Sequence, residues 1–363
     1  MPTLTVNIKK KLAGLDLVIN FKSSHGVTAL FGPSGSGKTT LLNIMAGLED
    51  ADNGHIKVDS SFLFNKTNGV NLSPQRRGIG YVFQDSKLFP HMNVRANLKY
   101  GDVFASKGDQ KANFEQLVQL LDLGGLLNRS PRTLSGGERQ RVAIGRAFLS
   151  APRLVLMDEP LASLDVDMRA ELIPYIEKLR DDFNIPIIFV SHNLNEVIRL
   201  ADLIVILKNG KSVVHGTVNK IMSSFSFSHS VKNDETSAVF DTVLMGHEEK
   251  YGLSNLVVNE IKIAVPRVNL PIGSKIRIRI LAHNVVLSKS YPVGSSILNV
   301  FKAQILEFSD YSGPYSDILL NIGIIIVARV TKKSVSHMKL ELGEHIYAMF
   351  KATALNELGF SYS

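Results

Sequence analysis

Eight residues, GPSGSGKT at positions 32–39, constrain the fold of this 363-residue chain more than any other feature. They match the pattern G-x-x-x-x-G-K-[ST] of a phosphate-binding loop. The apolar run VTALFG leads into them and the helical run TTLLNIMAGL follows, which is the strand–loop–helix context that the motif needs. An ordinary glycine-rich turn is the alternative, and this context argues against it. We therefore expect nucleotide phosphates to contact Gly32, Pro33, Ser34, Gly35, Ser36, Gly37, Lys38, Thr39 and Thr40.

The residue types in this loop suit phosphates bound together with magnesium. Glycines let backbone N–H groups wrap closely around phosphate oxygens. Lys38 is placed to reach the terminal phosphates, and the hydroxyl of Thr39 can ligate Mg²⁺. The loop therefore predicts a nucleotide site that includes a magnesium ion.

Two acidic residues follow another strand-like run. The apolar residues 154–157, LVLM, lead directly into Asp158 and Glu159. Ligands bind at the carboxyl ends of strands in open α/β sheets, so we expect Asp158 to orient the magnesium ion and Glu159 to polarise the attacking water. A solvated turn would explain two acids alone, but the phosphate loop favours the catalytic interpretation.

Two more polar residues each follow a strand. Gln84 comes after GYVF and can contact magnesium or water, and His192 comes after IIFVS and can contact the γ-phosphate. Singly, each is more often a satisfied polar residue than a ligand. Their order along the chain, with the two acids between them, favours a role in catalysis.

A second stretch, LSGGERQRVAIGRAF at 134–148, also has the features of an anion site. Ser135 suits an N-cap, and Glu138 completes the Ser-x-x-Glu capping box. Gly136 and Gly137 leave room for close approach, and the start of the amphipathic helix that follows offers free N–H groups and a positive dipole end. The sequence thus predicts two phosphate-binding elements in one nucleotide-binding domain, and the role of the second has to be explained.

The pattern of elements changes along the chain. Short apolar strands alternate with helical patterns to about residue 220, which indicates an α/β domain with a largely parallel sheet. The polar stretch IMSSFSFSHSVKNDETS is a predicted linker, and strand-like runs follow, which predict an all-β, barrel-like part. We place the boundaries at residues 1–230, 231–294 and 295–363.

Composition narrows the class of protein. Hydrophobic residues make up 45% and charged residues 20%, as in globular proteins, and the absence of cysteine excludes disulfides and thiolate metal sites. The N-terminus lacks an apolar signal core, and the most apolar run, DILLNIGIIIVARV, is too short to span a bilayer. We therefore expect a soluble, cytoplasmic chain whose net charge of +8 suits either an anionic partner or a basic surface without a role.

The phosphate loop, Gln84, LSGGERQ, LVLMDEP, SLD at 163–165 and His192 together resemble the ATP-binding subunit of ATP-binding cassette (ABC) transporters, over about residues 4–223. The resemblance implies a P-loop NTPase cassette that binds ATP and Mg²⁺ and packs head to tail in a homodimer. Ser135 and Gly137 would then contact the γ-phosphate held by the other chain, and Gly136 and Asp165 would also bind nucleotide. This arrangement explains the second anion site. The family's adenine-stacking aromatic is missing from NIKKKLAGLDL, which leaves the contacts of the base open.

The stretch SPQRRGIGYVFQDSKLFPHMNVRANLKYG is similar to importer subunits. In that group the residues after Gln84 dock the coupling helix of a membrane permease, so Phe89, Pro90, His91 and Met92 are candidates for this contact. A loop packed on its own domain is the alternative.

The tail resembles the small molybdate-binding β module of molybdate importer ATPases and storage proteins, an OB-like barrel. The match rests on SSILNVFKAQILEF and on IIIVARVTKKSVSHMKLELGEHIYAMFKATAL, over about residues 295–355. Molybdate is a tetrahedral dianion, which hydroxyls, N–H groups and a lysine suit. The family's polar positions are Ser296, Asn299, Thr331, Ser334 and Lys351, although each could instead cap a turn or face solvent.

We therefore expect a homodimeric importer ATPase for molybdate on the cytoplasmic face of the inner membrane. It would drive a separate permease, depend indirectly on a periplasmic binding protein and bind no nucleic acid. A sulfate, iron, polyamine or sugar importer is the alternative within the class, and a tail that serves only storage or sensing is another. A soluble ABC ATPase linked to nucleic acid would suit the positive charge, but we would expect two fused cassettes or a long coiled coil, and the sequence shows neither.

Overall fold

The computed structural model describes residues 3–24, 26–103, 113–150, 152–225, 236–309 and 313–360, with residues 102–103 and 356–360 as backbone only. They form two compact units, Met1–Gly216 and Thr217–Ser363. The first unit mixes helices with parallel and antiparallel strands, and every strand pairing described in the second unit is antiparallel. This confirms the fold class expected from the sequence, an α/β cassette followed by an all-β part. Part of the predicted linker, residues 226–235, lies outside the described residues.

An eleven-stranded sheet runs through the first unit in the order β6-β5-β4-β1-β2-β11-β10-β3-β9-β8-β7. Neighbours from β10 to β7 are parallel, as are β2 and β11, whereas β1, β2, β4, β5 and β6 pair antiparallel with one another. The strands are β1 (Leu4–Leu12), β2 (Leu15–Ser23), β3 (Val27–Phe31), β4 (Asn53–Val58), β5 (Ser61–Asn65), β6 (Val70–Asn71), β7 (Ile79–Val82), β8 (Leu154–Asp158), β9 (Ile187–Val190), β10 (Leu203–Lys208) and β11 (Lys211–Thr217). Every residue of β3, β8 and β9 is buried, as expected for parallel strands that are covered on both faces.

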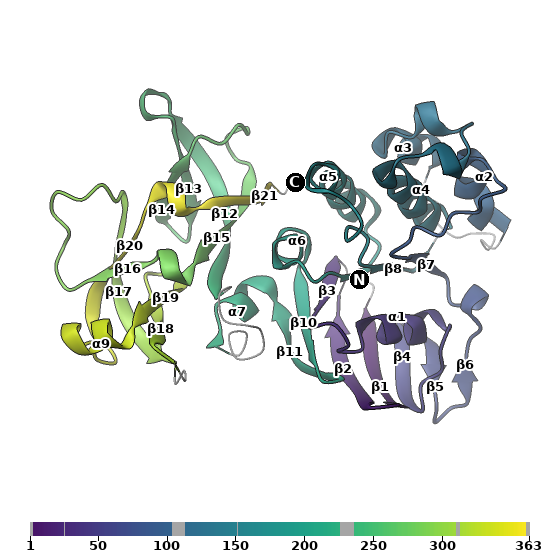
Figure 1. Cartoon of the computed structure of the whole chain (residues 1–363), viewed down its shortest axis with the longest axis horizontal. Helices are drawn as coiled ribbons and strands as arrows, with labels where there is room; N and C mark the ends of the chain where they lie inside the picture. The colour runs from purple at the N-terminus through teal and green to yellow at the C-terminus, as the bar shows by residue number, and fades with distance from the viewer. Residues whose placement is uncertain are drawn as a thin grey trace. The chain divides into compact units, whose positions relative to one another are not determined.

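The helices of the first unit fall into two groups. Figure 1 shows α2, α3 and α4 together, apart from α1, which lies by the strands β1, β2 and β4. Gly145 of α4 lets α2 and α3 come close, since a Cβ there would lie 2.9–3.1 Å from side chains of Leu98, Leu117 and Leu121. The helices are α1 (Lys38–Ala46), α2 (Val94–Lys99), α3 (Phe114–Leu120), α4 (Gly136–Leu149), α5 (Val166–Phe183) and α6 (Leu194–Leu200), with 3₁₀ turns η1 (Pro74–Arg76), η2 (Tyr100–Val103), η3 (Gly124–Leu126) and η4 (Pro131–Thr133).

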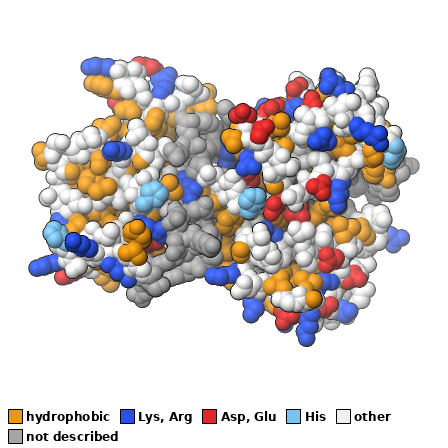
Figure 2. Space-filling view, in the orientation of Figure 1, with side chains coloured by type: hydrophobic (Ala, Val, Ile, Leu, Met, Phe, Trp, Pro, Cys, Tyr) orange, Lys and Arg blue, Asp and Glu red, His pale blue; other side chains and the backbone are white. Residues whose placement is uncertain are grey.

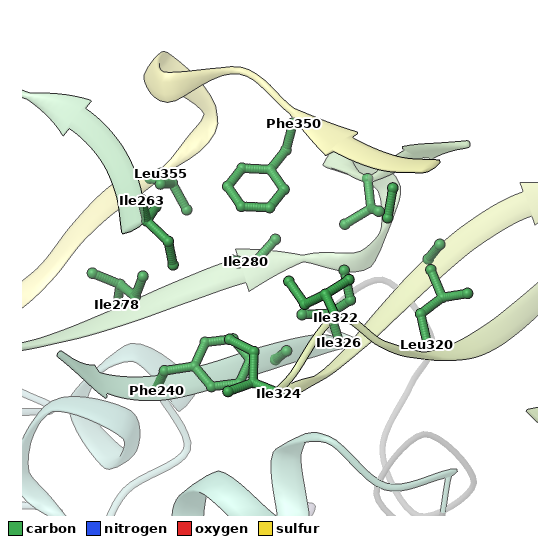
Figure 3. Close-up of a cluster of buried hydrophobic side chains, with 14 of the residues drawn as sticks. Phe240, Ile263, Ile278, Ile280, Leu320, Ile322, Ile324, Ile326, Phe350 and Leu355 are labelled. Atoms are coloured by element: carbon green, nitrogen blue, oxygen red, sulfur yellow. The ribbon is translucent and has the colours of Figure 1, made fainter. Parts of the chain in front are cut away.

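The second unit has two five-stranded sheets, β14-β13-β12-β15-β21 and β16-β20-β17-β18-β19. Their inner faces share one apolar core, in which Phe240, Ile278, Ile326 and Phe350 are buried (Figure 3). The strands are β12 (Ser237–Glu248), β13 (Leu253–Val258), β14 (Ile261–Pro266), β15 (Lys275–Leu281), β16 (Val286–Ser288), β17 (Asn299–Phe308), β18 (Tyr315–Asn321), β19 (Ile325–Thr331), β20 (His345–Phe350) and β21 (Asn356–Phe360). The helical elements are α7 (Val218–Met222), α9 (Lys332–Met338), η6 (Glu249–Tyr251), η7 (Ala282–Asn284) and η8 (Ala352–Ala354).

These two sheets are interleaved along the chain. β16 precedes residue 295 but pairs with β20 of the second sheet, and β21 follows that sheet but pairs with β15 of the first. The domain boundaries drawn from the sequence at 230/231 and 294/295 stay predictions. Among the described residues, no helix is both long and apolar enough to cross a bilayer.

Candidate functional site

The phosphate loop lies between β3 and α1. Gly35 and Gly37 have φ values of 77° and 96°, a left-handed conformation that glycine adopts without strain. At Gly32 a Cβ would lie 2.1 Å from the carbonyl oxygen of Leu207 in β10, so only glycine lets the loop begin this close to the sheet. Gly37 is the N-cap of α1, which directs the free N–H groups of the helix into the loop.

Lys38 extends back into this loop. Its Nζ donates to the carbonyl oxygens of Gly32 and Pro33 at 2.8 and 3.0 Å. Burial lowers the pKa of Lys38, and the nearby carboxylates of Glu159 and Asp158 oppose the shift. The hydroxyl of Ser36 is buried without a hydrogen-bond partner among the described residues, and buried polar groups rarely stay unsatisfied unless a ligand or water supplies the partner. These features fit a loop shaped for an anion.

Thr39 and Asp158 meet at the carboxyl end of β8. The Thr39 hydroxyl donates to Asp158 Oδ1 at 3.3 Å, and burial raises the pKa of Asp158. Among the described residues, no three His, Asp or Glu side chains are grouped so that they could hold a metal ion. Mg²⁺ usually takes one or two protein oxygens, and water and substrate phosphates complete its shell, so a hydroxyl and one carboxylate beside a phosphate loop suit it.

Glu159 and His192 lie at the same edge of the sheet. His192 Nδ1 is 3.4 Å from Glu159 Oε2, and the His192 side chain is 61% exposed. Glu159 has a φ of 46°, which is unfavourable for a residue with a side chain, and its N–H donates to Val190 O at 3.1 Å. The neighbouring strand β9 therefore helps to hold this conformation.

Gln84 is exposed two residues beyond β7. The parallel pairing of Val82 with Met157 brings the end of β7 beside that of β8, so Gln84 follows the same sheet edge as Asp158 and Glu159. The structure thus brings the predicted phosphate-loop, acidic, Gln and His residues to one edge.

The predicted second anion site is a helix start. Ser135 caps α4, and both bonds of the predicted capping box are present: Glu138 N–H to Ser135 Oγ at 3.1 Å, and Ser135 N–H to Glu138 Oε2 at 2.6 Å. Gly136 packs near Leu164, and Asp165 caps the neighbouring α5 by accepting from the N–H of Met168. The predicted residues Ser135, Gly136, Gly137 and Asp165 therefore lie at two adjacent helix starts.

The candidate docking segment is fixed by a residue that sequence reasoning missed. Asn97 is fully buried, accepts from the N–H of Phe89 and donates to the carbonyl oxygens of Phe89, Met92 and Asn93. Pro90 and His91 remain exposed. An asparagine inside the helical pattern NVRANLK was the available signal, because a polar side chain at an inward position needs partners.

This segment is also fastened to α4. The Ser86 hydroxyl donates to Gln140 Oε1 at 2.5 Å, and Arg146 donates to Ser86 O at 3.4 Å. The Arg146 guanidinium lies 5.1 Å from the centre of the Phe89 ring. The helix that begins at Ser135 is therefore joined to the loop that follows Gln84.

The predicted oxyanion residues fall into two separate groups in the second unit, three residues near the start of β17 and two at the start of α9. Asn299 is buried, and its amide exchanges two hydrogen bonds with the backbone of Ala264 at 2.8 and 2.9 Å, so it joins the two sheets. Lys351 follows Phe350, the partner of Asn299 across the ladder, and is exposed, as is Ser296. Thr331 caps α9 by accepting from the N–H of Ser334, and their hydroxyls lie 2.8 Å apart.

The β-ladder separates these two groups. β17 and β18 pair from Gln304–Asn321 to Phe308–Ile318, so Tyr315, the partner of Thr331, lies beyond the end of β17 that is farther from Asn299. One copy of the chain does not bring all five residues together. They are also absent from the lining of an open cavity of about 800 Å³ in this unit, which is formed by Asn219, Asp241, Asn259, Asn321 and neighbouring apolar residues.

Two family models match separate parts of the chain. A family model described as ABC transporter matches residues 18–162, and one described as TOBE domain matches residues 295–356. The chain is 41% identical to the molybdenum import ATP-binding protein ModC of Mesorhizobium japonicum, over 98% of this chain and 96% of that protein. It is 42% identical to the protein of the same name from Rhizobium johnstonii, over 97% of this chain and 99% of that one.

Solved structures resemble the first unit. The dimeric structure of MJ0796, a bacterial ABC transporter cassette, has a TM-score of 0.50 and 25% identity, covering 60% of this chain and 98% of that one. CbiO1 from Clostridium perfringens, part of the transporter complex cbiONQ, has a TM-score of 0.52 and 23% identity, covering 62% of this chain and 92% of that one, and shows the fold alone.

Proposed function

The chain belongs to the molybdenum import ATP-binding proteins of the ABC transporter family, and on this premise we propose that it is the ATP-hydrolysing subunit of a molybdate importer. One observation carries the proposal. In a chain this similar to those relatives over nearly its full length, Lys38, Thr39, Asp158, Glu159 and His192 meet at one edge of the sheet.

The residues at this edge divide the work of ATP hydrolysis. The phosphate loop and Lys38 hold the β- and γ-phosphates. Thr39, Asp158 and Gln84 hold Mg²⁺, which when bound offsets the negative charge of the phosphates. Glu159 accepts a proton as the water oxygen bonds to the γ-phosphorus and the bond to the β-phosphate oxygen breaks, which leaves ADP and phosphate. His192, held beside Glu159, donates to the γ-phosphate.

Two copies of the chain share each ATP. Ser135, Gly136, Gly137 and Asp165 contact the nucleotide that the phosphate loop of the other copy holds. Support comes from the free N–H groups at the capped start of α4 and from the dimeric state of the related cassette. Bound ATP then holds the homodimer together, and its hydrolysis lets the two copies separate.

A membrane permease docks on Phe89, Pro90, His91 and Met92, and this contact holds the subunit at the cytoplasmic face of the inner membrane. A periplasmic binding protein acts only through the permease. The tie between this segment and α4, through Ser86 and Gln140, supports a mechanical link from the permease to the ATP site.

The relatives' names favour molybdate over the sulfate, iron, polyamine and sugar alternatives. A nucleic-acid partner finds no support on the face shown in Figure 2, where basic side chains lie among acidic and apolar ones. A nucleic-acid-binding surface would gather its lysines and arginines into a continuous patch or stripe.

The tail binds molybdate between two copies of the chain. Its two groups of polar residues lie at opposite ends of a ladder, so Ser296 and Lys351 of one copy complete a shell with Thr331 and Ser334 of the other. Asn299 contributes by holding the strand end in place.

The first prediction tests the ATPase assignment. Glu159→Gln removes the proton acceptor and keeps the shape of the side chain, so ATP still binds, but hydrolysis falls by at least about 100-fold. Lys38→Ala is the contrasting variant and loses ATP binding itself. Binding is measured by calorimetry and turnover by phosphate release, with Lys66→Ala as an exposed lysine control.

Transport is tested in the same variants. A host strain without this gene should accumulate little molybdenum at limiting molybdate, the wild-type chain should restore accumulation, and Glu159→Gln should not. Hydrolysis by Glu159→Gln at the wild-type rate contradicts the catalytic assignment. Restoration of sulfate uptake in place of molybdate uptake contradicts the substrate.

A further inference from the structure

Two buried ion pairs join helices α5 and α6. Arg199 of α6 donates to both carboxylate oxygens of Glu177 in α5, at 2.8 and 3.0 Å. In the second pair the charges are reversed. Arg169 of α5 has its Nε 3.4 Å from Oε1 of Glu196 in α6, an ion-pair distance without hydrogen-bond geometry. Both carboxylates are almost completely buried.

The second pair, Arg169 and Glu196, also contacts two loops outside the helices. Ser191, itself buried, donates to Glu196 Oε2 at 2.6 Å, and it directly precedes His192. At the other end, Arg169 donates to the carbonyl oxygen of Leu164 at 3.2 Å, and Leu164 directly precedes Asp165. One carboxylate and one guanidinium thus connect the His192 loop to the turn that starts α5.

That turn packs against the start of α4. A Cβ on Gly136 would lie 3.5 Å from the Leu164 side chain, and one on Gly137 would lie 3.8 Å from Met168. A displacement of residues 164–168 therefore moves the surface on which the start of α4 rests. In the proposed homodimer, His192 faces the ATP of its own chain, whereas Gly136, Gly137 and Asp165 face the ATP of the other.

We propose that Glu196 and Arg169 are positioning residues that couple the two ATP sites of the homodimer. The proposal rests on the shared sites described above. When ATP draws the His192 loop into place, Ser191 carries Glu196 with it, and Arg169 transmits the change to the Leu164–Asp165 turn. ATP at one site then prepares the same chain to complete the other site.

Burial of the Glu196 carboxylate makes its connection to Ser191 and Arg169 rigid. A carboxylate removed from water cannot exchange Ser191 or Arg169 for solvent at low cost, so its contacts move together. Burial also raises the pKa of Glu196, and the Ser191 hydrogen bond and Arg169 oppose that shift. The His192 loop and the Leu164–Asp165 turn belong to different ATP sites but shift together. ATP binding at one site therefore favours ATP binding at the other, which appears as positive cooperativity.

The test measures ATP hydrolysis by the full-length homodimer as a function of ATP concentration. The wild-type Hill coefficient should lie clearly above 1 and approach about 2, the limit for two sites. Glu196→Gln keeps the shape and can still accept from Ser191, but it loses its charge toward Arg169. Its Hill coefficient should fall to about 1, while a substantial part of the maximal rate remains.

Glu177→Gln is the matched control, because it weakens the other buried ion pair between the same two helices and touches neither loop. It should lower the melting temperature about as much as Glu196→Gln and leave the Hill coefficient at the wild-type value. If Glu196→Gln does not fold, Arg169→Lys carries the test. A lysine keeps the charge, but its single ammonium does not span Glu196 and Leu164 O as the two guanidinium nitrogens do, so cooperativity should again be lost.

The coupling is overturned by a wild-type Hill coefficient of about 1, or by the same loss of cooperativity in Glu177→Gln as in Glu196→Gln. An unchanged coefficient in both Glu196→Gln and Arg169→Lys overturns it as well. All of these leave Glu159-dependent hydrolysis intact. Failure of the proposed function looks different, because hydrolysis would then be absent or would survive Glu159→Gln.

Discussion

Ser135 has two tasks that a substitution can separate. Its hydroxyl accepts from the N–H of Glu138 and closes the capping box, and its position also places it at the proposed interface. Loss of an N-cap costs about 1 kcal/mol of stability and would leave the interface open. A bulky cation at the same place would instead block the partner's nucleotide.

Ser135→Arg should therefore keep ATP binding to each chain and abolish ATP-driven dimerisation. The variant is examined by size-exclusion chromatography with ATP in a Glu159→Gln background, which prevents hydrolysis. Ser135→Asn, which preserves a good cap, should lose far less dimer. If Ser135→Arg chains dimerise as well as the parent, ATP is not shared through this helix start.

At this scale the sequence was informative where a short motif determines local geometry. The capping box and the phosphate loop depend on neighbours within a few residues, and both appear as expected. Asn97 and Gln140 could not be assigned in the same way. Ser86, the partner of Gln140, lies 54 residues away in the sequence, and Phe89, the partner of Asn97, lies in the loop before α2, whose path no short motif determines. Only the tertiary structure therefore identifies what these two side chains hold.

Among the elements, α2 carries a buried connector. Asn97→Leu would remove the acceptor of the Phe89 N–H and the amide donor to three carbonyl oxygens, of which those of Phe89 and Asn93 would still accept from a backbone N–H. We expect the free energy of unfolding to fall by about 3 kcal/mol, because several buried polar groups lose a hydrogen bond at once. Asn113→Ala, which removes only the exposed cap of α3, should cost about 1 kcal/mol.

Urea unfolding monitored by circular dichroism compares the two variants. In addition, molybdate uptake should fall more than ATP hydrolysis in Asn97→Leu, because the docking segment and not the phosphate loop loses its support. Equal losses in uptake and hydrolysis would argue against a separate docking role for this segment.

Strands β12 and β15 are joined by the ion pair of Asp241 and Arg277, whose contribution to stability should fall at low pH. Burial alone would raise the pKa of Asp241, but hydrogen bonds from Arg277 and Asn219 and the nearby charge of Arg277 lower it below the ordinary value. A lowered folded-state pKa stabilises the fold above the unfolded-state pKa of about 4 and loses this effect as the pH falls through the folded-state value.

The difference in unfolding free energy between wild type and Asp241→Asn should therefore be constant near neutral pH and shrink below about pH 4. Urea titrations from pH 3 to 7 give this difference. Because Asp241 is about half exposed, the effect should be modest. A difference that does not change with pH would assign the contribution of Asp241 to something other than its charge.

The elements themselves were partly predictable. The runs VTALF, LVLMD and IIFV are apolar apart from Thr28 and Asp158, and they form buried parallel strands, because strands covered on both faces need apolar side chains on both. The order of strands within the antiparallel sheets was not predictable from such runs. Alternating patterns set which face is buried, but not which distant strand pairs with which.

For the whole molecule, molybdate binding by the tails should affect ATP hydrolysis by the cassettes. If two tails share the oxyanion, its binding favours one arrangement of the homodimer, and ATP hydrolysis should slow when that arrangement holds the cassettes apart. Molybdate or tungstate should slow hydrolysis by the full chain, and phosphate should not. The longer metal–oxygen bonds fit a larger shell, in which phosphate makes slack contacts.

Lys351→Ala should abolish this inhibition and leave hydrolysis without molybdate unchanged. Lys302→Ala, an exposed lysine elsewhere on β17, serves as the control. Rates are followed by phosphate release over a molybdate titration. Full inhibition of the Lys351→Ala chain would remove this lysine from the site, and the absence of any molybdate effect on the wild type would leave the tail as a dimerisation module.

The path of β21 has a consequence for how the protein is made. β15 has β12 on one side and β21 on the other, and all of the second sheet lies between β15 and β21 in the sequence. During translation, β15 therefore leaves the ribosome with one edge unpaired. This edge stays unpaired until the second sheet and then β21 have been synthesised. An open strand edge is a template for pairing with other chains. Nascent chains that stall within residues 282–355 would carry this exposed edge, and molecular chaperones have most reason to act on this protein during that interval.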